Sequence, residues 1–198
     1  MTIRGFDIYD GLLDRDAQVA LIAELRALIS ETPMVQPVLP SGRKMSVRMT
    51  SLGRLGWVTD RKGYRYQATH PNGRPWPEIP HRILHIWQMV SGVTRAPDCC
   101  LMNYYSQDAK MGLHQDKDEG NFDWPVVSIS LGDEALFRMG NVTRGGKTES
   151  LWLRSGDVVV MGGDARLAYH GIDRIKPGTS DLLPKGGRLN LTLRVVEL

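Results

Sequence analysis

The C-terminal segment Arg188–Arg194 carries the pattern that most restricts the fold of this chain. In RLNLTLR, leucines alternate with Arg188, Asn190, Thr192 and Arg194. Because successive side chains of a β-strand point to opposite faces, the pattern predicts a strand with one apolar face and one polar face. An ordinary surface strand would fit this pattern. A strand at the mouth of a barrel would fit it too, because a guanidinium there can bind a carboxylate through two parallel hydrogen bonds.

Further short segments upstream are rich in β-forming residues and are separated by turn signals such as Arg-Gly-Gly and Ser-Gly-Asp. Strands are predicted near Cys100–Tyr105, Val126–Leu131, Ala135–Met139, Ser150–Leu153 and Asp157–Met161, and the last strand is expected to reach Val196. Many short strands of this kind predict a β-sandwich or a jelly roll.

Two helices are expected before these strands. Residues Asp14–Glu31 place apolar side chains at helical spacing, with Asp14 suited to the N-cap. A second helix is expected from about Pro80 to Ser91, since proline suits a first turn and Gly92 can end a helix. The stretch between residues 37 and 80 has weak periodicity and predicts short hairpins and loops. The predicted fold class is therefore α+β, with the helices on one side of the strands.

Length and charge restrict the organisation and the partners. A chain of 198 residues can bury one sizeable core but is short for two domains of ordinary size, so one domain is expected over residues 1–198. The 25 basic and 22 acidic residues leave a formal charge of only +3, far below that of a protein that coats DNA electrostatically. Charge alone therefore does not indicate nucleic acid.

The two cysteines and the N-terminus indicate the compartment. Cys99 and Cys100 are adjacent, and a disulfide between neighbours would strain the backbone, so a reducing compartment is expected. The first residues, MTIRGFDIYD, lack the apolar stretch of a signal peptide, and no run of about 18 apolar residues could span a bilayer. A soluble cytoplasmic protein is the expectation.

Three residues form a candidate metal site. His114 and Asp116 are two positions apart in LHQDKDE, so on an extended segment both side chains point to one face. His170 is the best third ligand, because it follows a predicted strand, whereas the other histidines lie in the loop region or on the second helix. Two histidines and one carboxylate are typical of non-haem iron(II) oxygenases. Taken alone, a His-x-Asp triplet more often marks a solvated turn, and a lone histidine is more often structural.

Four longer motifs occur in order along the second half of the chain: NYYSQDAKMGLHQDKDE, PVVSISLG, SGDVVVMGGDARLAYHGI and RLNLTLR. Together they resemble the catalytic core of the AlkB family. The resemblance begins near Met45 and also covers MSVRMTSLGRLGW and NGRPWPEIP, whereas the chain before it shows little beyond a helix followed by a loop.

The resemblance implies a double-stranded β-helix, or jelly roll, with N-terminal helices and a nucleotide-recognition lid at about residues 37–80. It implies iron(II) held by His114, Asp116 and His170, and 2-oxoglutarate whose distal carboxylate pairs with Arg188. The other residues that match family positions around this cosubstrate are Asn103, Tyr105, Asn190 and Arg194.

The implied reaction consumes O2, converts 2-oxoglutarate into succinate and CO2, and hydroxylates the N-methyl group of a damaged base, which then loses formaldehyde. The implied substrates are 1-methyladenine and 3-methylcytosine in single-stranded or duplex DNA, with RNA as an open alternative. The protein is expected to act as a monomer.

On the substrate side, the resemblance places Trp57 and Tyr64 on the lid, where an aromatic platform for a flipped base competes with plain core packing. A base that is cationic after alkylation would also be attracted by a carboxylate, and Asp118 is placed to supply it. Further substrate-side matches are Arg65, Tyr66 and Arg144, although a solvated loop arginine is the rival interpretation for Arg144.

The sequence departs from the family pattern at Tyr104, where a basic residue is common, and around Arg43, where an aromatic is expected. These departures bear on phosphate contacts and lesion preference. Two other functions compete with this interpretation. One is a 2-oxoglutarate oxygenase that acts on tRNA, a protein side chain or a small molecule. The other is a non-catalytic binding jelly roll, which would require a damaged metal triad.

Overall fold

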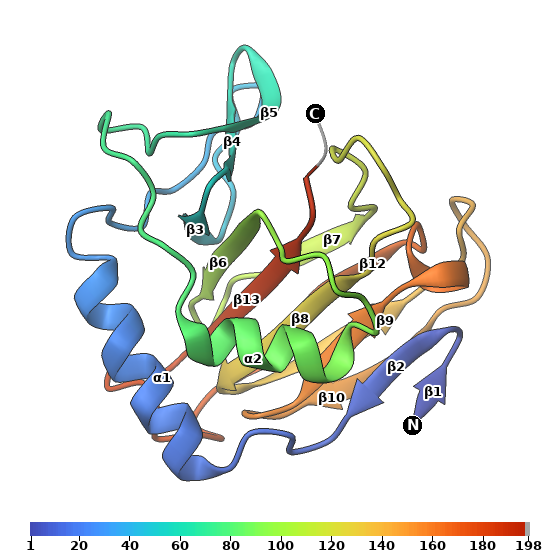
Figure 1. Cartoon of the computed structure of the whole chain (residues 1–198). Helices are drawn as coiled ribbons and strands as arrows, with labels where there is room; N and C mark the ends of the chain where they lie inside the picture. The colour runs from blue at the N-terminus through green and yellow to red at the C-terminus, as the bar shows by residue number, and fades with distance from the viewer. Residues whose placement is uncertain (197–198) are drawn as a thin grey trace.

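The computed structural model describes residues 1–196, and its strands form two main antiparallel sheets (Figure 1). The larger sheet contains, in spatial order, β1 (Thr2–Ile3), β2 (Phe6–Tyr9), β11 (Val158–Met161), β8 (Val126–Gly132), β13 (Arg188–Arg194), β6 (Cys99–Tyr105) and β3 (Arg48–Gly53). The smaller sheet contains β10 (Glu149–Leu153), β9 (Glu134–Met139), β12 (His170–Lys176) and β7 (Met111–His114).

The two sheets share an apolar core between them. Val159 and Met161 from the larger sheet belong to the same buried cluster as Phe137, Met139 and Ile172 from the smaller sheet. This arrangement of two antiparallel sheets, with strands that are distant in sequence lying side by side, is the jelly roll that the sequence predicted.

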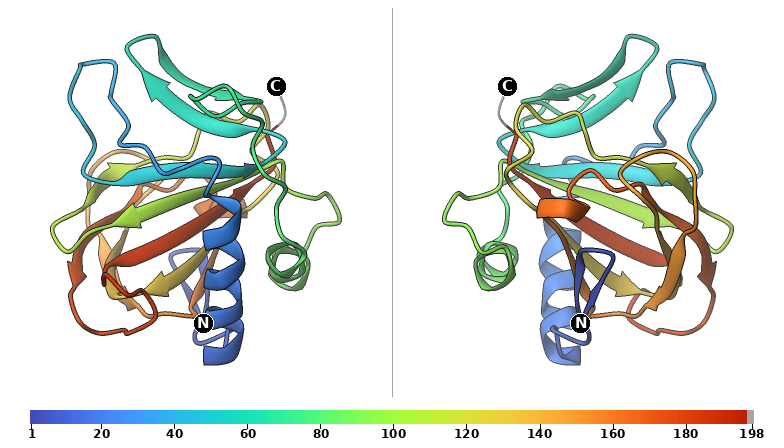
Figure 2. Two further views of the ribbon diagram at one scale, coloured as in Figure 1. Left: turned by 90° about the vertical axis from the view of Figure 1, so that its left-hand side faces the viewer. Right: turned by 90° about the vertical axis from the view of Figure 1, so that its right-hand side faces the viewer.

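Both predicted helices cover the outer face of the larger sheet. They are α1 (Arg15–Leu28) and α2 (His81–Val90), and Figure 2 shows α1 along the sheet and α2 end-on beside it. Asp14 is the N-cap of α1, because its side chain accepts a hydrogen bond of 2.8 Å from the backbone N–H of Ala17. No helix within residues 1–196 is both long and apolar enough to cross a bilayer.

The side chains of β13 alternate between an apolar face and a polar face, as predicted. Its leucines Leu189, Leu191 and Leu193 pack in the cluster that lies under the helices. Its polar residues face the opposite way and line a cavity between the sheets. Burial of leucine against α1 and α2 thus orients the two arginines of the strand towards the interior.

The neighbouring cysteines lie on opposite faces of β6. Cys99 belongs to the core between the sheets, and Cys100 belongs to the core under the helices. Both thiols are free and buried, in agreement with the expectation that they form no disulfide with each other.

A two-stranded hairpin stands beyond one end of the sandwich (Figure 1). It consists of β4 (Gly56–Asp60) and β5 (Gly63–Gln67), within the region predicted to form hairpins and loops. The Asp60 carboxylate accepts a hydrogen bond of 2.7 Å from the backbone N–H of Lys62, which closes the turn, and Gly63 follows at a positive φ of 111°. We call this hairpin, residues 56–67, the lid hairpin.

Four of the strands within residues 1–196 lie outside the segments predicted to form strands or hairpins. β1 and β2 lie in the N-terminal region that was expected to hold only a helix and a loop, and β2 joins the larger sheet through β11. β7 is only four residues long, and β12 is interrupted by a bulge between Ile172 and Arg174. Short strands and bulged strands lack a sustained alternation, so periodicity does not reveal them.

Candidate active site

A cavity of about 560 Å³ opens between the sheets on the side of the lid hairpin. Its walls come from both sheets, from the lid hairpin and from the loop that follows β7. The sequence-predicted residues that line it are Trp57, Tyr64, Asn103, Tyr105, His114, Asp116, Asp118, Arg144, His170, Arg188, Asn190 and Arg194. Residues that are distant in sequence therefore meet in one place.

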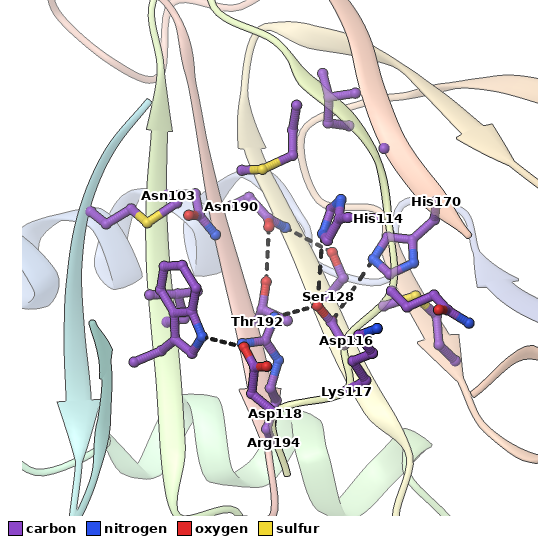
Figure 3. A pocket seen from close by; sticks show the side chains of 18 of the residues that line it. Asn103, His114, Asp116, Lys117, Asp118, Ser128, His170, Asn190, Thr192 and Arg194 are labelled. Atoms are coloured by element: carbon purple, nitrogen blue, oxygen red, sulfur yellow. Dashed lines mark hydrogen bonds and ion pairs between the residues drawn. The ribbon is translucent and has the colours of Figure 1, made fainter. Parts of the chain in front are cut away.

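His114, Asp116 and His170 converge on one point of this cavity (Figure 3). β7 ends at His114, β12 begins at His170, and these two residues are partners in the antiparallel ladder. One ligand atom from each of the three residues lies within 4.8 Å of the others. The predicted triad is thus assembled by the pairing of two strands that the sequence did not reveal.

Backbone contacts orient both imidazoles of the triad. Nδ1 of His114 lies 2.9 Å from the carbonyl of Gly112, and Nδ1 of His170 lies 3.0 Å from the carbonyl of Ala168. A carbonyl can only accept, so Nδ1 carries the proton in each ring and Nε2 keeps its lone pair. The Nε2 atoms of His114 and His170 lie 3.7 and 3.8 Å from the Asp116 carboxylate.

The charge states of the triad suit a cation. Burial would raise the pKa of Asp116, but the charge of Arg194 and the two imidazoles hold that pKa well below its usual range. Burial, followed by the influence of His114, lowers the pKa of His170 to about 4. Oδ2 of Asp116 is buried and has no hydrogen-bond partner among residues 1–196. An ionised carboxylate, a neutral imidazole and an unpartnered oxygen fit a metal ion.

Arg188 supplies a second binding element deeper in the cavity. Its side chain is fully buried, with Nη2 donating a hydrogen bond of 3.0 Å to Ser130. Within the described chain, its Nε and Nη1 atoms are buried without a hydrogen-bond partner, and its guanidinium lies 5.3 Å from the ring centroid of Tyr105. A buried cation with free donors requires an anion, so the position fits a carboxylate.

Four polar side chains, Asn103, Ser128, Asn190 and Thr192, line the same cavity as the triad, and we call them the polar floor (Figure 3). Asn190 donates a hydrogen bond of 2.7 Å to Ser128 and accepts one of 3.0 Å from Thr192. Oδ1 of Asn103 is buried and has no partner within the described residues. Arg194, by contrast, contacts the triad itself, with Nη2 at 2.9 Å from Oδ1 of Asp116.

The lid side of the cavity carries an aromatic pair and a carboxylate. The ring centroids of Trp57 and Tyr64 are 5.6 Å apart with an interplanar angle of 20°, which is a stacked arrangement. The indole Nε1 of Trp57 donates a hydrogen bond of 2.7 Å to Oδ2 of Asp118. Asp118 therefore holds the indole while its other oxygen remains available.

Two predicted substrate residues do not line the cavity. Arg65 pairs with Asp60 at 2.9 Å within the lid hairpin. Tyr66 is buried, and its hydroxyl donates to Glu119. Their assignment to substrate contacts remains a prediction that this arrangement does not favour.

Sequence reasoning missed a buried ionic cluster beside the triad. Glu119 and Arg166 lie 3.1 Å apart, and each side chain is almost fully buried. Glu119 belongs to the same LHQDKDE motif as the triad, which was a signal for its position, but nothing in the sequence distinguishes a buried carboxylate from a solvated one. Also missed were the methionines that line the cavity, namely Met45, Met49, Met111 and Met161.

Comparisons with known proteins agree with this geometry. The family model of the 2OG-Fe(II) oxygenase superfamily matches residues 5–194. An "Alpha-ketoglutarate-dependent dioxygenase AlkB homolog" from Caulobacter vibrioides is 51% identical over 193 residues, which cover 97% of this chain and 88% of that protein. A "DNA N(6)-methyladenine demethylase ALKBH1D" from Arabidopsis thaliana is 31% identical over 220 residues, which cover 96% of this chain and 49% of that protein. The solved structure "The structure of OsALKBH1" superposes with a TM-score of 0.83 at 34% identity and covers 98% of each chain.

Proposed function

The chain belongs to the AlkB family of 2OG-Fe(II) oxygenases, and on this basis we propose that it removes methyl groups from 1-methyladenine and 3-methylcytosine in nucleic acid. Oxidative dealkylation of nucleic acid is the activity that its relatives support.

One observation carries the proposal: the aromatic pair Trp57–Tyr64 and the metal triad line the same cavity. A base that is turned out of a nucleic-acid strand needs a flat apolar surface on which to stack. Stacking against Trp57 would hold the base in the cavity that contains His114, Asp116 and His170. The lid hairpin and the sandwich thus supply recognition and chemistry to one substrate.

His114, Asp116 and His170 would hold iron(II), and Arg188 would bind the distal carboxylate of 2-oxoglutarate. When bound, these two groups supply the oxidising chemistry: O2 and 2-oxoglutarate are converted into succinate and CO2, and the N-methyl group is hydroxylated. Within the polar floor, Asn103 would turn its amide to the same cosubstrate, because its Oδ1 has no partner among the described residues, while hydrogen bonds to Ser128 and Thr192 fix the Asn190 amide beside it. The hydroxymethyl product is a hemiaminal, which loses formaldehyde and restores the base.

Asp118 would distinguish charged from neutral lesions. Methylation at the pairing nitrogen of adenine or cytosine makes the base cationic. Oδ2 of Asp118 is engaged by Trp57, so Oδ1 can face a base stacked on the indole. Asp118 is exposed in the free protein, so its attraction for a cation strengthens only when a bound base excludes water.

Product analysis by mass spectrometry tests the proposal. Methylated single-stranded DNA, duplex DNA and tRNA should be incubated side by side with iron(II), 2-oxoglutarate and O2. We expect loss of the methyl group with formation of one formaldehyde and one succinate per base repaired. If no nucleic acid is demethylated while the protein still turns over 2-oxoglutarate on another compound, the small-molecule or protein alternative is correct.

A further inference from the structure

A buried cluster of four charged side chains and one tyrosine connects the lid hairpin to the metal triad. Its members are Tyr66 from β5, Asp116 and Glu119 from the loop after β7, Arg166 after the short 3-10 helix η1 (Gly163–Ala165), and Arg194 at the end of β13. All five are at most 8% exposed. The residues come from four separate parts of the chain, and only Tyr66 belongs to the lid hairpin, so the cluster is complete only when the lid hairpin lies against the sandwich.

At the lid end, the cluster depends on one phenol. The Tyr66 hydroxyl donates to Oε1 of Glu119 and accepts a hydrogen bond of 3.3 Å from Nη1 of Arg194. Tyr66 is the direct cross-strand partner of Trp57, and opposite residues of an antiparallel pair project from the same face. A displacement of Trp57 with its strand would therefore displace Tyr66 as well.

At the metal end, the cluster holds both the side chain and the backbone of Asp116. Nη2 of Arg194 lies 2.9 Å from Oδ1 of Asp116, and Nη1 of Arg166 donates a hydrogen bond of 2.6 Å to the Asp116 carbonyl. Glu119 lies between the two guanidiniums, 3.1 Å from Arg166 and 3.6 Å from Nε of Arg194. These contacts engage Oδ1 of Asp116 and leave Oδ2 for the metal.

Building on the proposed function, we propose that Tyr66 and Glu119 are positioning residues that couple the seating of the lid hairpin to metal binding at Asp116. When the lid hairpin is seated, the phenol completes the hydrogen bonding of Glu119 and Arg194, and Arg194 holds the Asp116 carboxylate. When the lid hairpin lifts, a buried carboxylate and a buried guanidinium each lose a partner. Thermodynamic linkage then requires the coupling to be reciprocal: bound metal stabilises the seated lid, and a seated lid strengthens metal binding.

Hydrogen–deuterium exchange tests the coupling without nucleic acid. Backbone amides of residues 56–67 should be followed in the apoprotein and in the protein loaded with Mn(II) and 2-oxoglutarate. In the wild type, we expect loading to slow this exchange about fivefold to tenfold, within the range of coupling between linked sites. Tyr66→Phe removes only the hydroxyl, and we expect it to abolish most of this slowing.

Tyr104→Phe is the matched control, because the Tyr104 hydroxyl donates to the Gly186 carbonyl at 3.1 Å, outside the cluster. It should keep the wild-type slowing. Equal slowing in the wild type and in Tyr66→Phe would overturn the coupling, and so would equal loss of slowing in both tyrosine variants. The coupling and the proposed function can fail independently. If loading slows exchange in the lid hairpin but the protein demethylates no nucleic acid, the coupling is supported and the proposed function is refuted.

Metal affinity gives the reciprocal readout. Titration calorimetry with Mn(II), with and without a methylated oligonucleotide, should show tighter metal binding in the presence of the oligonucleotide. The ratio of the two affinities should fall towards one in Tyr66→Phe and in Glu119→Gln, which keeps the shape of the side chain. A variant that folds and binds Mn(II) with an unchanged ratio would assign these residues a purely structural role.

Discussion

Two parts of the cavity differ in burial and in origin. The strand-borne part contains the metal triad and Arg188, and the lid-borne part contains Trp57 and Tyr64 on the lid hairpin. Asp116 and His170 are each 7% exposed, and Arg188 is 1% exposed. Tyr64 on the lid hairpin is 52% exposed. His114, His170 and Arg188 are thus held on strands of the two main sheets, with Asp116 on the loop that follows β7, whereas Trp57 and Tyr64, which are proposed to bind the base, stand on a short hairpin. This difference indicates that the chemistry requires a fixed geometry, while recognition tolerates adjustment.

The largest effect should follow from removal of a triad residue. His114→Ala, Asp116→Ala or His170→Ala should reduce demethylation roughly a thousandfold or more, because the metal supplies several kcal/mol of the catalysis. Formaldehyde release with iron(II) in excess measures this, with folding checked by circular dichroism. His85→Ala, on the exposed side of α2, is the control and should keep its activity. A folded triad variant with near wild-type turnover would show that the strand-borne site does not bind the catalytic metal.

Arg188→Lys tests the second strand-borne group. A lysine cannot reproduce the planar donor set of the guanidinium, so the apparent KM for 2-oxoglutarate should rise about 10-fold to 100-fold. The KM for nucleic acid should change little at saturating cosubstrate. Titration of 2-oxoglutarate measures the effect, and an unchanged constant would move the anchoring role to Arg194 or to another residue.

Trp57→Ala tests the lid-borne platform. Loss of a stacking contact costs about 1–3 kcal/mol per base, so kcat/KM should fall up to about a hundredfold for methylated and etheno bases alike. The KM for 2-oxoglutarate should stay near the wild-type value, since Arg188 and the triad are untouched. Steady-state kinetics with each adduct give the comparison. A selective rise in the 2-oxoglutarate KM would contradict the separation between the two parts of the cavity.

Substitution of Asp118 should have the smallest and most selective effect. Asp118→Ala removes both the charge and the acceptor for the Trp57 indole, whereas Asp118→Asn keeps an acceptor and removes only the charge. Both variants should reduce kcat/KM for 1-methyladenine and 3-methylcytosine about tenfold, and Asp118→Asn should spare a neutral etheno base. Competition assays between charged and neutral adducts measure this selectivity. If Asp118→Asn lowers kcat/KM equally for charged and neutral adducts, Asp118 does not read the charge of the base and only positions Trp57.

The two parts of the cavity also differed in how well the sequence predicted them. The spacing of His114 and Asp116 and the alternation around Arg188 are local patterns, and the structure brings all three residues to the cavity. The lid-borne predictions are less complete: Tyr66 was assigned to the substrate side, and because its buried hydroxyl donates to Glu119, that assignment stays a prediction that the structure does not favour. The aromatic side chains Trp57, Tyr64 and Tyr66 share one face of the hairpin, so alternation alone does not show which of them is buried against the sandwich and which lines the cavity.

The sequence by itself determined the features that depend on neighbouring residues. These are the helices, six strands of the two main sheets, the polar face of β13 and the two-residue spacing within the triad. Only the tertiary structure decided which of these features meet. The pairing of His170 with His114 spans 56 positions, and the contact of Arg194 with Tyr66 spans 128. Such contacts depend on how sheets and loops pack. An ionisable side chain can be buried only where the fold supplies a partner for it, and its neighbours in the sequence do not reveal which residue that partner is.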